Sequence, residues 1–227
     1  MPASLSVIIP SLNASAALPE TAEALLSGAT DGLIRELVIS DGGSTDQTRE
    51  AAAELGALWL PGPPGRGMQI ARGVAASSAP WLLILHADTH LSDGWTTAVR
   101  HHIADRSGMA GYFRLKFRAN GIVPRFVAGG TNLRSRWLSL PYGDQGLLIS
   151  RRLLEDVGGY PEIPLMEDVA MARRLKGCLR PLDAEARTSA ERYLRDGWAR
   201  RIVRNLGTLL RYKLGANPDD LVARYER

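Results

Sequence analysis

The chain has 227 residues, one cysteine and a formal net charge of +4. Its length suits one large domain, and its 45% hydrophobic and 23% charged residues are typical of a folded globular protein. The lone Cys178 excludes an internal disulfide and a cysteine zinc cluster, and it fits a reducing compartment. Residues 1–19 are uncharged but contain three prolines and no basic residue, so we expect neither a signal peptide nor a membrane span there.

The first ninety residues alternate between short apolar runs and segments of helical character. The apolar runs, which predict buried strands, are residues 5–10, 36–40, 57–60 and 81–85. The predicted helices are one that begins near Pro19 and includes residues 22–26, and others at residues 46–55 and 68–76. Strands that are apolar on both faces need helices on both sides. The pattern therefore predicts an α/β fold with a mostly parallel central sheet and helices on both faces.

The second half of the chain is less regular. Residues 111–117 and 146–150 are strand candidates, and residues 167–176 predict a helix. Residues 195–214 predict one long amphipathic helix, whose apolar side we expect to pack on the core. A last short helix is predicted after Asn217.

Polar residues follow the predicted strands of the first half. Ligands of parallel sheets bind beyond the carboxyl ends of the strands, so one crevice could gather these side chains. They are Ser11, Asn13, Asp41, Arg66, His86 and Asp88.

Three acidic segments could carry chemistry, and each also has a plain structural explanation. Asp41 begins Asp-Gly-Gly-Ser-Thr-Asp and could accept hydrogen bonds from a nucleobase, although such residues also form ordinary turns. Asp88 could hold a divalent cation that bridges two phosphates, or it could cap a turn. Of the adjacent acids Glu167 and Asp168, one could face a cleft as a general base, but acids are also common in first helical turns.

Two further segments carry weaker signals. The glycine-rich residues 140–146 could form a loop that a substrate approaches closely, or an ordinary turn. The arginines of residues 195–211 flank an apolar stripe and could bring this helix to a membrane surface. No nucleic-acid-binding module or dense basic face is visible, so we expect no nucleic-acid partner.

Taken in order, these motifs resemble the family 2 glycosyltransferases, which have the GT-A fold. The resemblance rests on residues 7–13, 38–46, 83–88 and 166–168. More narrowly, the chain is similar to the radical-SAM/selenodomain-associated transferase 2 group, through residues 65–67, 85–89, 132–136, 141–146 and 163–168.

The resemblance implies a set of donor-binding residues. Pro10 and Asn13 would line the nucleotide pocket, and Asp41 would accept a hydrogen bond from the base, which we expect to be uracil. Arg66 would lie near the base or the diphosphate. Asp144 and Gln145 would touch the donor sugar or the acceptor.

The resemblance also implies the chemistry. Asp88 would hold Mn²⁺ or Mg²⁺ against the diphosphate, and Asp168, with Glu167 beside it, would deprotonate the acceptor hydroxyl. His86 stands where the family usually has an aspartate that contacts ribose. We assign His86 to the nucleotide-sugar site, where it could contact the ribose, the metal or neither. The implied reaction is a displacement with inversion at the anomeric carbon of a UDP-linked sugar.

The resemblance covers nearly the whole chain and implies one GT-A domain over residues 1–227. Residues 1–90 would bind the nucleotide sugar, residues 91–194 would form the acceptor and catalytic half, and residues 195–227 would be C-terminal amphipathic helices. We expect a cytoplasmic enzyme, and its hydroxyl acceptor is not identified by the sequence. The basic C-terminal helix could simply be solvated, or it could hold the enzyme as a peripheral protein at the inner face of an anionic membrane that carries a lipid-linked acceptor.

Two alternative functions remain open. A sugar-phosphate nucleotidyltransferase would need a glycine-rich phosphate loop after the first strand, and residues 11–15 do not form one. A nucleotide-sugar-binding regulator without catalysis is favoured by His86 and opposed by Asp88 and Asp168.

Overall fold

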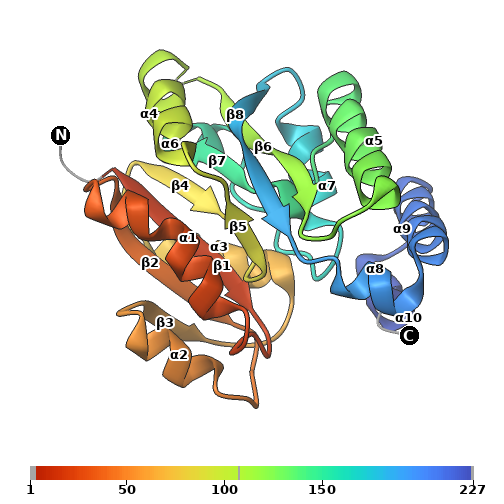
Figure 1. Ribbon diagram of the computed structural model, residues 1–227, viewed down its shortest axis with the longest axis horizontal. Coiled ribbons are helices and arrows are strands. Elements are labelled where there is room, and N and C mark those ends of the chain that lie inside the picture. The colour runs from red at the N-terminus through yellow and green to blue at the C-terminus, as the bar shows by residue number, and fades with distance from the viewer. Residues whose placement is uncertain (1–3, 107, 226–227) are drawn as a thin grey trace.

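The computed structural model describes residues 4–106 and 108–225 and contains an eight-stranded mixed sheet (Figure 1). The strand order is β3-β2-β1-β4-β7-β6-β8-β5. The strands are β1 (Leu5–Ser11), β2 (Ile34–Asp41), β3 (Leu58–Pro61), β4 (Trp81–Ile84), β5 (Thr89–Leu91), β6 (Ala110–Phe117), β7 (Leu147–Ser150) and β8 (Leu179–Thr188). Strands β1 to β4 are parallel to one another, as predicted, whereas β7 is antiparallel to both β4 and β6.

Helices cover both faces of the sheet, as predicted. They are α1 (Leu18–Thr30), α2 (Thr48–Glu54), α3 (Arg66–Ala76), α4 (Trp95–Asp105), α5 (Ile122–Leu138), α6 (Arg151–Asp156), α7 (Glu167–Arg174), α8 (Glu191–Asp196), α9 (Trp198–Lys213) and α10 (Pro218–Tyr225). Side chains alternate along β1, so Val7 and Ile9 share one buried cluster with residues of α1, α2 and α4. Ile8 faces the other way, into a cluster with residues of α3, α6, α7 and α9.

The C-terminal helices differ from the prediction in two ways. The single helix expected over residues 195–214 is wrong, because Gly197 interrupts it with φ 83° and ψ 135°, a conformation that favours glycine. The apolar side of α9 packs on the core only in part: Leu209 is buried in a core cluster, whereas Val203 and Leu206 are exposed. Arg201 and Thr208, on the polar side, are buried. Among the helices of the described residues, none has the length and apolar character needed to cross a bilayer.

Candidate active site

The base-binding residues predicted after β1 and β2 form one hydrogen-bonded turn. Asp41, at the end of β2, is 2% exposed, and its Oδ2 accepts hydrogen bonds from the backbone N–H groups of Gly43 and Ser44, both at 2.8 Å. Its Oδ1 accepts from the hydroxyls of Ser11 and Ser44. The Asp41 carboxylate therefore shapes the turn, and its contact with a base stays a prediction.

Asn13 joins the end of β1 to this turn. Its backbone lies in the left-handed region with φ 51°, and its side-chain Oδ1 accepts a hydrogen bond from the Thr45 N–H at 2.9 Å. The Asn13 N–H donates to the Ser44 hydroxyl at 2.8 Å. Asn13 is exposed, whereas Pro10 is buried inside β1, so of the two only Asn13 presents an open side chain.

Helix α3 ties the two strand ends together through residues that the sequence analysis missed. The buried Gln69 donates from Nε2 to the carbonyl oxygens of Ser11 (2.8 Å) and Ser40 (2.9 Å). Arg72 donates to the Asp41 carbonyl at 2.7 Å. A signal was present, because polar residues recur every third position along Arg66, Gln69 and Arg72 and so share one side of a helix.

Arg66 stands at the first turn of α3 between two predicted site residues. Its Nε lies 3.2 Å from Glu167 Oε1, and its Nη1 lies 3.4 Å from His86 Nε2. Gly67 makes this possible, because α3 begins directly against the loop before α7. A Cβ on Gly67 would lie 2.1 Å from the Pro161 carbonyl oxygen.

Burial shifts the proton affinities of Glu167 and His86 in the directions that favour their neutral forms. Burial and the negative charge of Asp168 raise the pKa of Glu167 to about 7, although Arg66 lowers it. Burial, with the positive charges of Arg66 and Arg192, lowers the pKa of His86 to about 3. His86 is therefore neutral near pH 7, and its Nε2 can accept a hydrogen bond from Arg66.

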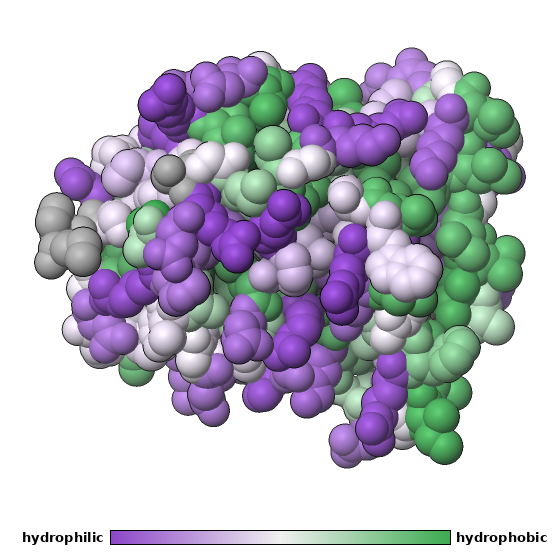
Figure 2. Space-filling view, turned by 90° about the horizontal axis from the view of Figure 1, so that it is seen from above, coloured by the Kyte–Doolittle hydropathy of each residue, from purple (hydrophilic) through white to green (hydrophobic). Residues whose placement is uncertain are grey.

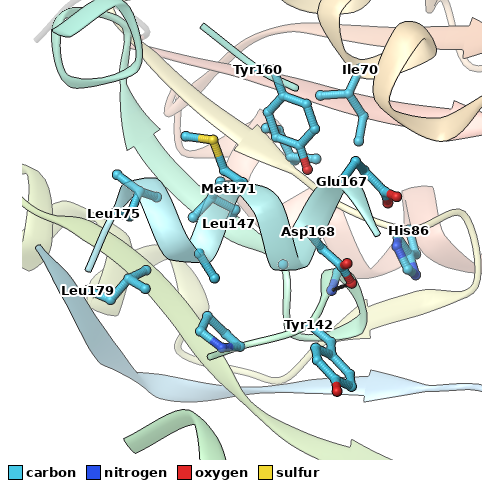
Figure 3. Close-up of a pocket in the computed structure, with 15 residues that line it drawn as sticks. Ile70, His86, Tyr142, Leu147, Tyr160, Glu167, Asp168, Met171, Leu175 and Leu179 are labelled. Carbon is cyan, nitrogen blue, oxygen red and sulfur yellow. Dashed lines mark hydrogen bonds between the residues drawn. The ribbon is translucent and has the colours of Figure 1, made fainter. Parts of the chain in front are cut away.

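Glu167 and Asp168 point in different directions from the start of α7, as neighbours on a helix must (Figure 3). Glu167 is 1% exposed, and its Oε2 receives no hydrogen bond from any described residue. Asp168 is half-buried on the side of Tyr142, and its Oδ2 accepts from the Gly143 N–H at 2.8 Å. Gly143 is packed closely here, since a Cβ would lie 2.5 Å from His86 Nε2.

A third carboxylate, Asp144, follows Gly143 directly. Burial and the charges of Asp168 and Asp88 raise its pKa to about 6, against the opposing effect of Arg134. Its Oδ1 is buried and has no hydrogen-bond partner in the described part of the chain. The structure thus brings Asp88, Asp144 and Asp168 close enough for their charges to interact. No group of three metal-ligating side chains was found among residues 4–106 and 108–225.

The structure corrects the prediction for Gln145, which was expected to touch the sugar or the acceptor. This side chain is 0% exposed, and its Nε2 donates to the Phe113 carbonyl at 3.1 Å. Its Oε1 accepts from the Ser135 hydroxyl at 2.6 Å. Gln145 therefore fastens the 140–146 loop to the core instead of facing a ligand.

A cavity runs along α7 behind these charged groups. Polar residues line one end of it, including His86, Tyr142, Tyr160, Glu167 and Asp168. Apolar residues such as Met171, Leu175 and Leu179 line the other end (Figure 3). Tyr142 and Tyr160 were not predicted as site residues. The guanidinium carbon of Arg134 lies 3.4 Å from the centre of the Tyr142 ring, which is a cation–π contact.

Comparison with known proteins shows the family of this chain. The sequence profile of glycosyl transferase family 2 matches residues 6–146, which is more than half of the chain. The chain belongs to glycosyltransferase family 2. The predicted family is confirmed, and membership opposes the nucleotidyltransferase alternative.

Curated relatives of this family 2 chain include the glucosyl-3-phosphoglycerate synthases of Mycobacterium tuberculosis and Mycobacterium bovis. Each is 32% identical over 93 residues. The matched part is 37% of this chain and 28% of the relative, so the chain spans well under a third of these curated relatives.

Solved structures of the Mycobacterium tuberculosis synthase share the fold. The complex with Mn²⁺ and UDP-glucose matches with a TM-score of 0.56 and 21% identity, over 78% of this chain and 68% of the other. Another structure of that synthase matches with a TM-score of 0.57 and 22% identity, over 82% and 72%. At this identity the likeness shows the fold alone, and it confirms the expected GT-A fold.

Proposed function

We propose that this family 2 member is an inverting, metal-dependent glycosyltransferase that transfers a sugar from a UDP-linked donor to a hydroxyl acceptor. The placement of Asp168 supports this function most strongly. Its carboxylate is accessible at the cavity, its Oδ2 is oriented by the Gly143 N–H, and its charge is felt at Asp144. A fixed carboxylate with free lone pairs is suited to general-base catalysis.

In the proposed reaction Asp168 takes the proton of the acceptor hydroxyl. The acceptor oxygen then forms a bond to the anomeric carbon, while the bond from that carbon to the diphosphate oxygen breaks on the opposite side. The proton remains on Asp168, and the electron pair leaves with the nucleoside diphosphate. Displacement in line inverts the anomeric configuration.

Arg66 would stabilise the leaving diphosphate. Its guanidinium is fixed by Glu167 on one side and by neutral His86 on the other. A positioned guanidinium is well suited to phosphate oxygens because its donors lie in one plane. His86 would thus position Arg66 in place of the ribose contact that an aspartate makes in the family.

Asp88 would hold the divalent cation, with Asp144 beside it. Carboxylate oxygens are the ligands that Mg²⁺ and Mn²⁺ prefer, and Asp144 offers a buried Oδ1 that receives no hydrogen bond from the described residues. When bound, the cation would neutralise negative charge on the leaving diphosphate. The Mycobacterium tuberculosis synthase, which shares the fold, has been solved with Mn²⁺ and UDP-glucose.

For the acceptor we propose a hydroxyl compound carried by a lipid, with the enzyme at the inner face of the membrane. The synthase with the similar fold has been solved with phosphoglyceric acid, a soluble compound. The lipid proposal rests instead on the surface beside the cavity, which is described in the next subsection.

Calorimetric titration of UDP with and without Mn²⁺ tests the donor site. We expect Mn²⁺ to raise the affinity for UDP by about tenfold or more, the equivalent of one good charged contact. Asp88→Asn should remove this gain, whereas Asp93→Asn, at an exposed acid five residues later, should retain it. An affinity that does not respond to Mn²⁺ would contradict the metal site.

A screen of nucleotide sugars for slow hydrolysis tests catalysis without an identified acceptor. We expect turnover of a UDP-sugar by the wild type. Tight binding of a nucleotide sugar with no hydrolysis and no transfer to any acceptor would favour the regulatory alternative.

A further inference from the structure

Most of the exposed large hydrophobic side chains lie on one side of the molecule. Fourteen are exposed among the described residues, and eleven of these belong to α5, α8, α9 or the residue that follows α9. The eleven, which we call the α5/α9 face, are Ile122, Val123, Phe126, Leu133, Trp137, Leu138, Leu194, Val203, Leu206, Leu210 and Leu214. Figure 2 shows apolar side chains gathered along this edge.

On each helix these side chains form a stripe directed away from the core. Along α5, Ile122, Phe126, Leu133 and Trp137 are spaced by four, seven and four residues, and their exposed fractions run from 53% to 84%. Along α9 the apolar residues recur at intervals of three and four from Val203. A large exposed apolar surface of this kind marks an interaction site.

The two helices are neighbours, so their stripes form one surface. Trp198, the first residue of α9, packs against the buried cluster that contains Ala128 of α5. Leu209 of α9 shares another cluster with Leu140, which comes two residues after α5. Both helices lie at the same end of the molecule in Figure 1, which agrees with the apolar edge in Figure 2.

The positive charge of the chain is concentrated on the same two helices. They contain eight basic residues, namely Arg125, Arg134, Arg136, Arg200, Arg201, Arg204, Arg211 and Lys213, and no acidic residue. The whole chain has 28 basic and 24 acidic residues, so the remainder has 20 basic and 24 acidic residues, a net charge of −4. The excess of positive charge therefore lies on these two helices, although Arg201 is buried and Arg134 stacks on Tyr142.

The exposed arginines stand beside the apolar stripes. Arg125 and Arg136 each precede a stripe residue of α5, and Arg211 follows Leu210 of α9, so each lies about 100° round its helix from the stripe. An apolar stripe with basic flanks is the pattern of a helix that lies in a membrane interface.

We propose that the α5/α9 face docks on an anionic lipid bilayer. The apolar side chains would enter the interface, and the flanking arginines would meet anionic headgroups. A second copy of this chain is less suitable as the occupant, because self-association would bring like-charged arginines together.

Docking through this face would also bring a lipid-linked acceptor close to the proposed active site. This part of the inference rests on the proposed function. Helix α5 ends at Leu138, four residues before Tyr142 at the cavity. A bilayer on the α5/α9 face would therefore lie on the same side as the 140–146 loop, where a lipid-linked hydroxyl could approach Asp168.

Vesicle flotation of the full chain tests the docking without any assay of transfer. Vesicles of phosphatidylcholine alone are compared with vesicles that also contain phosphatidylglycerol. We expect the protein to bind the anionic vesicles about tenfold more tightly than the neutral ones. Contact of only one or two basic residues with anionic headgroups is enough for a difference of this size. Equal or absent binding to the two vesicle types would overturn the proposal.

Two surface variants identify the face. Phe126→Ser combined with Leu206→Ser should abolish flotation, whereas Leu26→Ser, at a residue of α1 that is 58% exposed, should not. Circular dichroism checks that both variants are folded. Undiminished flotation of the folded double variant would overturn the assignment.

Two further measurements separate the bilayer from other occupants. Brominated lipid should quench the fluorescence of the wild type more than that of Trp137→Phe, since Trp137 is 75% exposed on this face. Sedimentation velocity should show the same monomeric species for the wild type and the double variant. If the wild type were a dimer and the double variant a monomer, a second copy of the chain would cover the face. That result would overturn the proposal.

Discussion

Asp168 and Glu167 are adjacent carboxylates whose environments differ sharply. Asp168 is half-buried and receives the Gly143 N–H, whereas Glu167 is buried against Arg66. A base that contacts the acceptor has to be accessible, and only Asp168 is. Glu167 instead holds the Arg66 guanidinium, so we assign it a positioning role in place of the catalytic role first expected.

Replacing Asp168 by Asn should abolish transfer with little effect on donor binding. Asparagine keeps an oxygen for the Gly143 N–H but cannot take a proton. We expect kcat to fall by about 10²- to 10⁴-fold, the usual contribution of a general base. Calorimetry with UDP should show an unchanged affinity. Full turnover of this variant on an identified acceptor would rule out Asp168 as the base.

Residue type and spacing nominated the residues of the candidate site, and burial separates the roles that we propose for them. Gln145 and Asp144 are neighbours in one motif, and their sequence context predicted the same role for both. Gln145 is fully hydrogen-bonded inside the protein, whereas Asp144 keeps a buried oxygen without a described partner. Such a difference depends on which polar atoms lie nearby, here the Ser135 hydroxyl and the Phe113 carbonyl, and residues distant in sequence supply those atoms.

At the scale of elements, the start of α3 controls the geometry of the site. Gly67 donates its N–H to the Ile163 carbonyl at 3.1 Å, which fastens α3 to the loop before α7. Arg66 and Glu167 stand on the two sides of this junction. The distance between them therefore depends on close backbone contact at Gly67.

Replacing Gly67 by Ala should separate α3 from that loop. The new methyl group would lie 2.1 Å from the Pro161 carbonyl oxygen, which is backbone and cannot easily move. We expect a loss of about 1–3 kcal/mol in the free energy of unfolding, typical of overpacking, measured by urea denaturation.

Gly130→Ala is the matched control. Gly130 lies inside α5, and a Cβ there would meet nothing within 4 Å. The substitution should raise the free energy of unfolding by about 0.5–1 kcal/mol, because alanine favours the helix. If Gly67→Ala were as stable as the control, the close contact at α3 would not matter.

The helices and strands with the clearest local sequence patterns were the ones predicted best. Strands β1, β2 and β4 are continuous apolar runs, so they were found close to their observed bounds. β8 was missed because Pro181 and four charged residues interrupt it, although Leu182, Ala184 and Ala186 alternate with charged neighbours. Helix α5 was missed because Pro124 and two central glycines, Gly129 and Gly130, weaken its local helical pattern.

For the whole molecule, the buried acids of the site make stability depend on pH. Glu167 has a pKa of about 7 in the folded protein against a usual value of 4.5. Between these values the folded state binds more protons than the unfolded state, so the contribution of Glu167 to stability is lost as the pH rises from about 4.5 to about 7. His86 acts in the opposite direction below its usual pKa of 6.5.

Comparing wild type with Glu167→Gln isolates the effect of Glu167, because His86 is present in both. Glutamine resembles the protonated acid. As the pH rises from 4.5 to 8, the free energy of unfolding of the variant should increase relative to that of the wild type by up to about 3 kcal/mol. The size of the pKa shift sets this value. Urea denaturation at a series of pH values measures this difference.

Glu162→Gln supplies the control, since Glu162 is an exposed carboxylate in the loop before α7. Its stability relative to the wild type should be the same at both ends of the pH range. If the stability of Glu167→Gln relative to the wild type also stayed constant with pH, the raised pKa of Glu167 would be contradicted.

The sequence by itself determined the parallel half of the sheet, the family and the chemical types gathered at the strand ends, because these depend on local apolar runs and on residue order. Tertiary structure decided which acid is accessible, which amide is buried, and that part of the apolar side of α9 is exposed beside α5. Burial and charge proximity arise from residues far apart in the chain: Arg66 lies against Glu167 across about a hundred residues, and the Phe117 ring packs against that of Trp198 across about eighty. No local sequence pattern contains the distances between such residues. These distances set the pKa values of the site and form the surface through which we propose the protein docks.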